Sequence, residues 1–552
     1  MPKSKLMIIG LDAATLRLVE PMAAEGKLPN LAKFMAGAAV GELASTLPAA
    51  SPASWSTFAT GMNPGGHGII SFVQMPQDSY APCFLNASNR RGRTFWEIAG
   101  EEGVRCGIMN VPVTYPPRPC NGFVVGCLLS PSVSPNMVSP PELLNDLLET
   151  SPHYVIDIDV AARPGRDVRE LMLKRALEAV ACRQRAAIGL YRKHRPDLFC
   201  VVFTEIDRIC HYFWSAHEAW RSGRTAEGLE TRLGQAIEAV YQRTDEAVGA
   251  VLAEVGDDTD VLIVSDHGAG PVRTGLNMRR ALADAGLFGE VRPSLGRRLF
   301  KRSLYLGVKM MPTRLRARIK STLPGLSSKT AGLVVETGVD WRRTLAYPCG
   351  DSGGIFVNLR GRQPMGTVAQ EDYETVRNRI IRALEVLVDP NTGRRVMRKV
   401  HRREEIWSGP CLERLPDVLA EQEEQTYDTP LALPTCASPD DLFYSLPPSL
   451  PTIRHRDGGH TRDGLIMAKG PDIKPGRIEG ARMLDVAPTV MAMLGCAVPA
   501  HFEGKVLTQM LQQQIEVKSL DDSQSGGGGS ATALSSAEQQ AVADRLRGLG
   551  YI

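Results

Sequence analysis

Short apolar runs recur along the chain and alternate with stretches in which apolar residues return every three or four positions. Continuous apolar runs bounded by polar turns are typical of parallel strands buried on both faces. The runs cover 5–10, 105–110, 198–203 and 260–265, and the helical patterns cover 167–193 and 226–255. Strands that alternate with helices predict an α/β sandwich with a mostly parallel central sheet and helices on both faces.

Acidic and histidine side chains follow three of these apolar runs. Asp12 comes just after the first run, Asp207 after the third, and Asp266 with His267 after the fourth. In open parallel sheets, ligands bind outside the carboxyl ends of the strands. The order of these residues in the chain therefore predicts that their side chains converge in space.

Two further histidines extend this set. His211 follows Asp207 by four positions, so the two share one face if the segment is helical. His460 lies almost two hundred residues later, in the glycine-rich block GGHTRDG. Three Asp and three His form a ligand set for two divalent metals, and two metals with one hydroxyl suffice for in-line attack on phosphorus.

A hydroxyl-rich block at 45–72 supplies candidates for that hydroxyl. Ser51, with Pro52 behind it, is placed to open a helix whose N-terminus would help to hold an anionic phosphoryl group. A serine hydroxyl is a weak nucleophile until a base or a metal activates it. Ser45, Thr46 and Ser54 are the alternatives in the same block.

Together these blocks resemble the type I phosphodiesterase/nucleotide pyrophosphatase branch of the alkaline phosphatase superfamily, in a bacterial form. The resemblance rests on Ser51, Trp55, the TGMNPGGHGI element at 60–69, and the DHG, D-x3-H and GGH blocks. Segments 94–117 and 341–417 extend it, so that it spans residues 5 to 510. Any one block alone is a weak signal, but their combination is specific.

The resemblance implies a ligand assignment and a mechanism. One metal takes Asp207, His211 and His460, and the other takes Asp12, Asp266, His267 and the oxygen of Ser51. Mixed histidine and carboxylate ligands suit Zn²⁺ and also accept Mn²⁺. Ser51 would attack phosphorus and carry a phosphoryl or nucleotidyl group, which water then releases.

The chain departs from the family pattern beside the nucleophile. Ser54 stands where the branch often has an Asn that points at a phosphate oxygen, so we expect Ser54 to bind substrate as a shorter donor. Pro52 directly after Ser51 has no N–H to offer an oxyanion. The segment lacks a Cys in a C-x-P-x-R context, which argues against a formylglycine sulfatase.

Composition narrows the partners and the compartment. The 552 residues carry a net charge of +3, and the basic stretch has few aromatics, so specific nucleic-acid binding is not expected. Eleven cysteines without paired spacing fit reduced thiols. The sequence shows no signal peptide and no transmembrane run, which predicts a cytoplasmic protein. We expect a small phosphorylated substrate, with a nucleotide or a lipid head group as candidates.

The predicted organisation is a discontinuous catalytic domain at 1–290 and 336–515. A basic insertion at 291–335 interrupts it, and residues 292–329 hold eleven Lys or Arg and no acid. A solvated basic cap is the preferred interpretation, with an anionic-substrate lid or a membrane-surface helix as alternatives. A glycine-rich linker at 516–535 leads to a terminal helix at 536–552, expected to dock on the body or on a partner.

Some residues of these blocks have other expected roles. His67 is expected to stabilise its turn, whereas Tyr347, Asp351 and Asn358 are candidates to line the pocket.

Besides phosphodiesterase activity, the superfamily allows a phosphomonoesterase, a cofactor-independent phosphomutase or a head-group transferase. A metal-binding pseudoenzyme is the alternative outside catalysis, and the complete ligand set argues against it.

Overall fold

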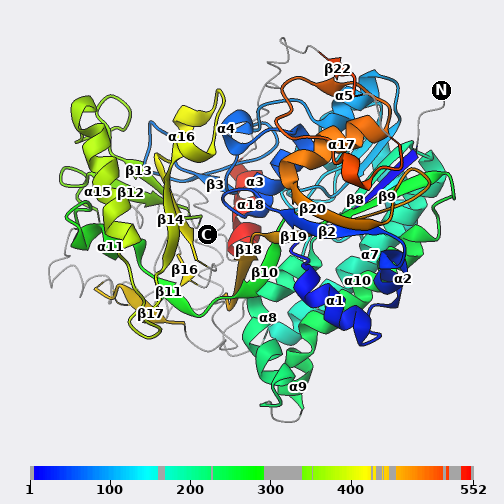
Figure 1. Ribbon diagram of the computed structural model, residues 1–552, viewed down its shortest axis with the longest axis horizontal. Coiled ribbons are helices and arrows are strands. Elements are labelled where there is room, and N and C mark those ends of the chain that lie inside the picture. Colours follow the sequence, from blue (N-terminus) through cyan, green and yellow to red (C-terminus); the bar gives the residue numbers. More distant parts are fainter. Residues whose placement is uncertain are drawn as a thin grey trace.

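The computed structural model describes residues 5–158, 168–224, 228–290, 339–350, 352–423, 427–429, 438, 440–446, 456–513, 517–520 and 536–548. The predicted basic insertion at 291–335, residues 521–535 of the predicted glycine-rich linker and Asp351 lie outside the described residues. Figure 1 shows a larger lobe built around an extended sheet and, beside it, a smaller lobe with a sheet of its own.

The larger lobe contains a nine-stranded sheet. The strand order is β20 (Gly476–Arg482), β2 (Ala39–Ala44), β19 (Asp463–Lys469), β9 (Thr259–Val264), β1 (Lys5–Leu11), β8 (Leu198–Phe203), β5 (Cys106–Met109), β6 (Gly122–Val125) and β7 (Val138–Ser139). Strands β9, β1, β8, β5 and β6 run parallel, as do β2 and β20. Strand β19 is antiparallel to both of its neighbours, and β7 is antiparallel to β6. The predicted mostly parallel sheet is confirmed, and all four predicted strands belong to it.

Alternate residues of the central strands enter two different cores. In β1, Met7 and Ile9 pack into one core, whereas Leu6 and Ile8 pack into the other. The first core is completed by α1 (Leu16–Ala24), α2 (Pro29–Met35), α6 (Leu143–Thr150), α7 (Arg169–His194), α8 (Glu205–Arg221) and α10 (Ala236–Leu252). The second is completed by α3 (Ser51–Thr60), α5 (Phe95–Glu101) and α17 (Val486–Met493). Burial on both faces explains why these strands read as continuous apolar runs.

One predicted helix is divided in the structure. The pattern at 226–255 forms α9 (Leu229–Gly234) and α10, and the chain turns between them at Gln235. Gly234 ends α9 against α8, where a Cβ on it would lie 2.4 Å from Trp220 Cβ. Close contact between the two helices therefore accounts for the glycine, and apolar periodicity alone does not show the break.

The smaller lobe is built on a four-stranded antiparallel sheet. Its strand order is β12 (Ala346–Cys349), β13 (Gly354–Val357), β15 (Val418–Gln422) and β14 (Met397–Arg402), with α15 (Tyr373–Glu385) and α11 (Met278–Asp284) packed in the same core. Tyr347 stacks on Phe356 in this core, and the amide of Asn358 donates to the carbonyls of Trp341 and Thr344. The expectation that Tyr347 and Asn358 line the pocket is wrong, because both side chains pack in the interior of this lobe.

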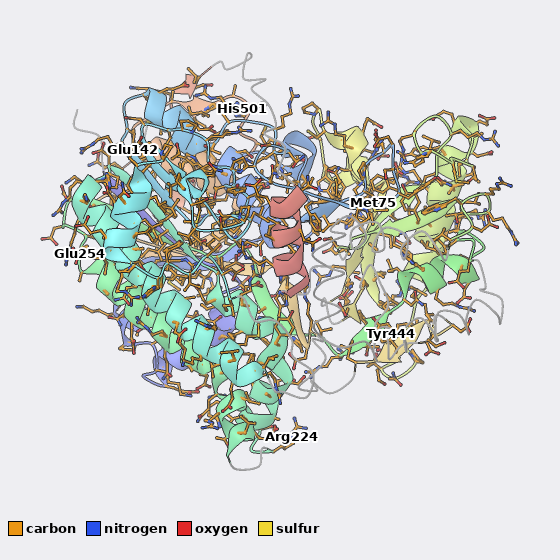
Figure 2. All side chains as sticks on the ribbon, turned by 180° about the vertical axis from the view of Figure 1, so that it is seen from behind. Met75, Glu142, Arg224, Glu254, Tyr444 and His501 are labelled. Atoms are coloured by element: carbon orange, nitrogen blue, oxygen red, sulfur yellow. The ribbon has the colours of Figure 1, made fainter. Side chains whose placement is uncertain are left out.

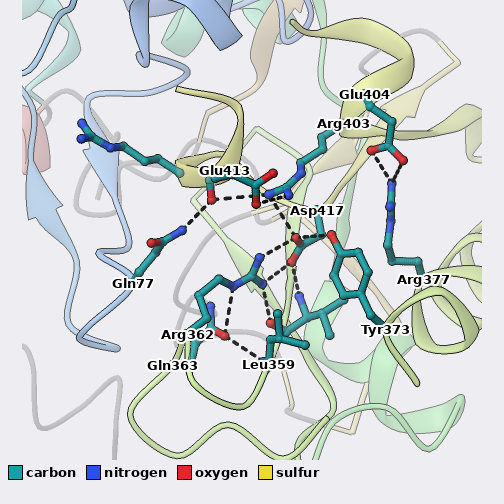
Figure 3. A network of polar contacts seen from close by, with 12 residues as sticks. Gln77, Leu359, Arg362, Gln363, Tyr373, Arg377, Arg403, Glu404, Glu413 and Asp417 are labelled. Carbon is teal, nitrogen blue, oxygen red and sulfur yellow. Dashed lines mark hydrogen bonds and ion pairs between the residues drawn. The ribbon is translucent and has the colours of Figure 1, made fainter. Parts of the chain in front are cut away.

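A buried carboxylate fixes the start of β15. Asp417 is fully buried and accepts hydrogen bonds from both Nη atoms of Arg362, at 2.7 and 2.5 Å, and from the Tyr373 hydroxyl at 2.7 Å. The Val357 amide donates to it at 2.7 Å, and Arg403 Nη1 lies 3.4 Å away (Figure 3). These bonds join β15 to β13 and α15, so they hold in place a strand that lines the cavity described below.

We expect Asp417→Asn to lower the free energy of unfolding by about 3–5 kcal/mol, because it removes a buried charge that pairs with the half-buried Arg362. Urea unfolding followed by circular dichroism would measure the change. Glu413→Gln is the matched control, since Glu413 pairs with Arg403 but its side chain is 75% exposed. A loss for Asp417→Asn no larger than that of the control would contradict this role.

The terminal helix docks on the larger lobe. Helix α18 (Ser536–Gly548) places Val542 and Leu546 in a core with Phe72, Tyr115 and Leu128. Arg545 Nη1 adds a hydrogen bond to the Leu128 carbonyl at 2.7 Å. Seen from behind, α18 is the red helix in Figure 2. Docking on the body, one of the two predicted possibilities, is therefore confirmed.

Candidate metal centre

The predicted convergence at the carboxyl end of the sheet is confirmed by the side-chain positions. Asp12 follows β1, Asp207 lies in the first turn of α8 after β8, and Asp266 with His267 follows β9. His460 reaches the same place from β18 (Gly458–Thr461), which pairs antiparallel with β10 (Gly268–Pro271). Pairing of His460 with Ala269 thus brings a distant part of the chain beside the DHG block.

The first group of ligand atoms centres on Asp207. Its Oδ1 lies 3.2 Å from Nε2 of His211 and 3.2 Å from Nε2 of His460. The two Nε2 atoms are 3.0 Å apart. The pair Asp207 and His211 shares one face of α8, as the four-residue spacing predicted.

The second group centres on His267. Its Nε2 lies 3.1 Å from Asp266 Oδ2, 3.7 Å from Asp12 Oδ1 and 3.0 Å from Ser51 Oγ. The Ser51 hydroxyl also lies 3.3 Å from Asp12 Oδ1. The rings of His267 and His460 stack with centroids 3.9 Å apart, so the two groups are adjacent.

Two sets of ligand atoms are close enough for metal binding. Atoms of Asp12, Asp266 and His267 lie within 4.8 Å of one another, and so do those of Asp207, His267 and His460. His267 belongs to both sets. The structure therefore brings the predicted residues together. The assignment of each residue to one of two ions remains a prediction made from the resemblance.

All three histidines present the nitrogen that a metal would need. Each Nδ1 contacts a backbone carbonyl: Gly458 O for His211 at 2.8 Å, Ala49 O for His460 at 2.9 Å and Gly268 O for His267 at 3.1 Å. A carbonyl only accepts, so each Nδ1 carries the proton and a neutral ring leaves Nε2 bare. Backbone contacts of this kind orient histidine ligands in metalloproteins.

Burial keeps two of these rings neutral. It lowers the pKa of His211 to about 4, and it lowers that of His267 well below its usual value. The charge of Arg456 also lowers the pKa of His211. The Nε2 atoms of His211 and His460 are 3.0 Å apart, and no proton lies between them when both rings are neutral. A cation bound by both nitrogen atoms would stabilise this arrangement.

The carboxylates repel one another at this site. Burial, followed by the charge of Asp207, raises the pKa of Asp12 to about 7, and burial with the charge of Asp12 raises that of Asp266 well above normal. Asp266 Oδ2 has no hydrogen-bond partner among the described residues. Divalent cations would compensate these charges, so the residues fit the metals that the resemblance implies.

Ser51 occupies the predicted place at the start of a helix. It is the first residue of α3, after the extended Ala50, and it is 2% exposed. Its hydroxyl thus lies where the helix dipole favours an anion. Four residues later, Trp55 Nε1 donates to Asp12 Oδ2 at 3.1 Å and fixes that carboxylate.

Ser54 points elsewhere. It is fully buried, and its Oγ lies 2.8 Å from both Ser45 Oγ and Thr46 Oγ1. This hydroxyl cluster joins α3 to the end of β2, and the contacts of Ser54 are with it rather than with Ser51. A direct substrate contact from Ser54 stays a prediction, and it would need that side chain to rearrange.

The glycine-rich element after α3 joins the two lobes. A Cβ on Gly65 would lie 2.5 Å from the carbonyl oxygen of Ser408, and Cys411 N donates to Gly65 O at 2.8 Å. His67 is buried, and its Nδ1 accepts from Ile69 N at 3.1 Å. The expected structural role of His67 in its turn is confirmed.

Asp457 was not predicted from the sequence. Its carboxylate accepts from the amides of Trp214 and Ser215 in α8, at 3.0 and 3.1 Å, and its own amide donates to His211 O at 2.9 Å. The segment just before His460 is thereby fastened to the helix that carries Asp207 and His211. Only its position three residues before His460 could have drawn attention to it.

A cavity of about 110 Å³ opens beside this cluster. Ala49, Pro52, His211 and His460 line it from the larger lobe, and Leu419, Ala420, Glu421 and Tyr427 are among those that line it from the smaller lobe. A ligand in the cavity would therefore touch both lobes while its reacting end faced the carboxylate and histidine cluster.

The family comparison places the chain among the phosphoester hydrolases of the alkaline phosphatase superfamily. The chain belongs to the type I phosphodiesterase/nucleotide pyrophosphatase family, whose model matches residues 6–430. His460 lies beyond that range, and the structure brings it to the residues within. A search of curated proteins found no match. Among the described residues, no helix has the length and apolar character needed to cross a membrane.

Proposed function

We propose that the protein is a metal-dependent phosphodiesterase that cleaves a small phosphorylated substrate through a covalent intermediate on Ser51. The observation that carries the proposal is the position of the Ser51 hydroxyl, at a helix N-terminus and within 3.3 Å of both Asp12 and His267. A buried hydroxyl placed against carboxylate and imidazole acceptors is suited to nucleophilic attack.

Two divalent ions, proposed to be Zn²⁺ with Mn²⁺ as the alternative, would be held by the residues gathered here. Asp207, His211 and His460 would hold one ion, and Asp12, Asp266 and His267 the other, with Ser51 beside it. Bound divalent ions supply Lewis acidity and charge neutralisation in phosphoryl transfer.

The protein's own side chains would carry out the steps of the reaction. Ser51 Oγ attacks phosphorus, the new Oγ–P bond forms as the bond to the departing alkoxide breaks, and Asp12 lies in reach of the hydroxyl proton. The N-terminus of α3 favours the anionic phosphoryl group. Water then hydrolyses the Ser51 ester, which releases the phosphoryl product and restores the hydroxyl.

The proposal is tested by a panel of chromogenic esters with protein loaded with Zn²⁺ or Mn²⁺. The panel holds bis-p-nitrophenyl phosphate, p-nitrophenyl thymidine monophosphate and p-nitrophenyl phosphate. We expect kcat/KM for the diesters to exceed that for the monoester by about tenfold or more. A monoester preference of similar size would show a phosphatase instead, and failure to cleave any ester would overturn the proposal.

A further inference from the structure

The two walls of the cavity carry different polar groups. The larger lobe contributes His211, His460 and Arg456, whereas the charged residues contributed by the described part of the smaller lobe are Glu421 and Asp428. A phosphoryl group held at the metal cluster would lie against the first wall. The ester substituent that extends from it would then face the two carboxylates.

Glu421 is held firmly in an ionised state. Its Oε2 contacts His401 Nε2 at 2.8 Å, and its Oε1 accepts from Arg462 Nη1 at 3.0 Å. Burial opposes ionisation, but these two partners keep the pKa of Glu421 below its usual value. An ionised carboxylate offers about four acceptor positions and no donor, so it can still accept from a ligand.

Asp428 is positioned by the backbone around it. It belongs to β16 (Tyr427–Asp428), where it pairs in register with Gly275 of β11 (Thr274–Leu276). The Gln422 side chain donates to Tyr427 O at 3.0 Å and accepts from Tyr427 N at 3.2 Å. These contacts fasten the segment that carries Asp428 to the end of β15, next to Glu421.

The cavity between the described residues of the two lobes is small. At about 110 Å³ it is well below the roughly 300–1,000 Å³ of pockets that enclose whole drug-sized ligands. Between the described residues of its two walls it has room for one small substituent. Further phosphate groups on that substituent would be placed against carboxylates, and like charges in contact are strongly disfavoured.

We infer that the substrate is a phosphodiester in which one ester group is a small alcohol bearing a hydroxyl or an ammonium, recognised by Glu421 and Asp428. This inference rests on the proposed phosphodiesterase function and deepens it. A hydroxyl and an ammonium can both donate hydrogen bonds to a carboxylate, and an ammonium is also attracted by its negative charge. Polyphosphate substituents are the class that the acidic wall would reject.

The test uses four diesters with one p-nitrophenyl group and a second group that is 2-aminoethyl, 2-hydroxyethyl, ethyl or 2-carboxyethyl. All four share the leaving group and the phosphate charge. We expect kcat/KM for the aminoethyl and hydroxyethyl esters to exceed that for the ethyl and carboxyethyl esters by about tenfold or more, the range of a hydrogen bond to a charged group.

Variants assign that preference to residues. Asp428→Asn and Glu421→Gln are each expected to reduce the aminoethyl preference, which is the ratio of kcat/KM for the aminoethyl ester to kcat/KM for the ethyl ester, by about tenfold. Asp428→Asn is decisive, because Glu421→Gln also weakens the ties to His401 and Arg462. Glu423→Gln is the matched control, since Glu423 is a neighbouring, exposed carboxylate that does not line the cavity.

The outcomes separate the two proposals. Hydrolysis of all four esters at similar rates, a preference for the carboxyethyl ester, or a preference that survives in Asp428→Asn would overturn the inference and leave the phosphodiesterase function standing. No hydrolysis of any ester would overturn the function, and the inference with it.

Discussion

Replacing Ser51 with alanine is expected to lower kcat for phosphodiester hydrolysis by about 10⁴- to 10⁶-fold, the loss that follows removal of a serine nucleophile. Alanine keeps the helix start of α3 and the burial of the site, but it cannot form a bond to phosphorus. The measurement is the initial rate with bis-p-nitrophenyl phosphate at saturating metal. Metal content, measured after dialysis, should stay near that of the wild type, because Asp12, Asp266 and His267 remain.

Ser56→Ala provides the control for this experiment. Ser56 lies in the same helix and is fully buried, and its hydroxyl has no hydrogen-bond partner among the described residues. Its loss should leave the rate close to wild type. A residual rate in Ser51→Ala above about one hundredth of wild type would be too high for loss of the nucleophile, and it would move the assignment to another hydroxyl or to direct attack by water.

The central sheet was predictable because burial on both faces leaves a direct trace in the sequence. Strands β1 and β8 read as unbroken apolar runs, and the topology of parallel sheets places whatever follows them at one edge. That rule was enough to bring Asp12, Asp207 and Asp266 together. The periodicity of α7 likewise follows from its one buried stripe.

The smaller lobe was not predictable in the same way. Two of its strands, β12 and β13, are four residues long, too short for alternation to be distinguished from a loop. Tyr347 and Asn358 were therefore assigned to the pocket on the resemblance, although aromatic stacking and three carbonyl acceptors place them in the lobe interior. Long-range pairing, not local pattern, decides their position.

The orientation of the site was also hidden from the sequence. The proton on each histidine Nδ1 is set by a backbone carbonyl, such as Ala49 O for His460, and any residue can supply a carbonyl. Ser54 illustrates the opposite problem. Its spacing from Ser51 suggested a substrate contact, but on α3 its side chain meets Ser45 and Thr46 instead.

Replacing Asp207 with asparagine is expected to reduce bound metal from two ions per chain toward one and to lower kcat/KM by more than about 100-fold. The reason is the position of Asp207 Oδ1, 3.2 Å from both His211 Nε2 and His460 Nε2. An amide keeps the shape but loses the charge that compensates a cation. The expected loss exceeds the roughly 10- to 100-fold cost of removing a partner outside the ligand set. Metal analysis by inductively coupled plasma spectrometry and rates with added Zn²⁺ would measure both effects.

Asp260→Asn is the matched control for this substitution. Asp260 is also buried, but it lies at the start of β9, whereas Asp266 follows the end of that strand. There the Asp260 carboxylate accepts a hydrogen bond from Asp472 N at 3.1 Å. It should retain two ions and nearly full activity, whatever it costs in stability. If Asp207→Asn kept two ions and lost activity, Asp207 would act on the substrate rather than on a metal. If both variants lost metal alike, the cause would be general destabilisation, and the ligand assignment would have to rest on Asp12, Asp266 and the histidines instead.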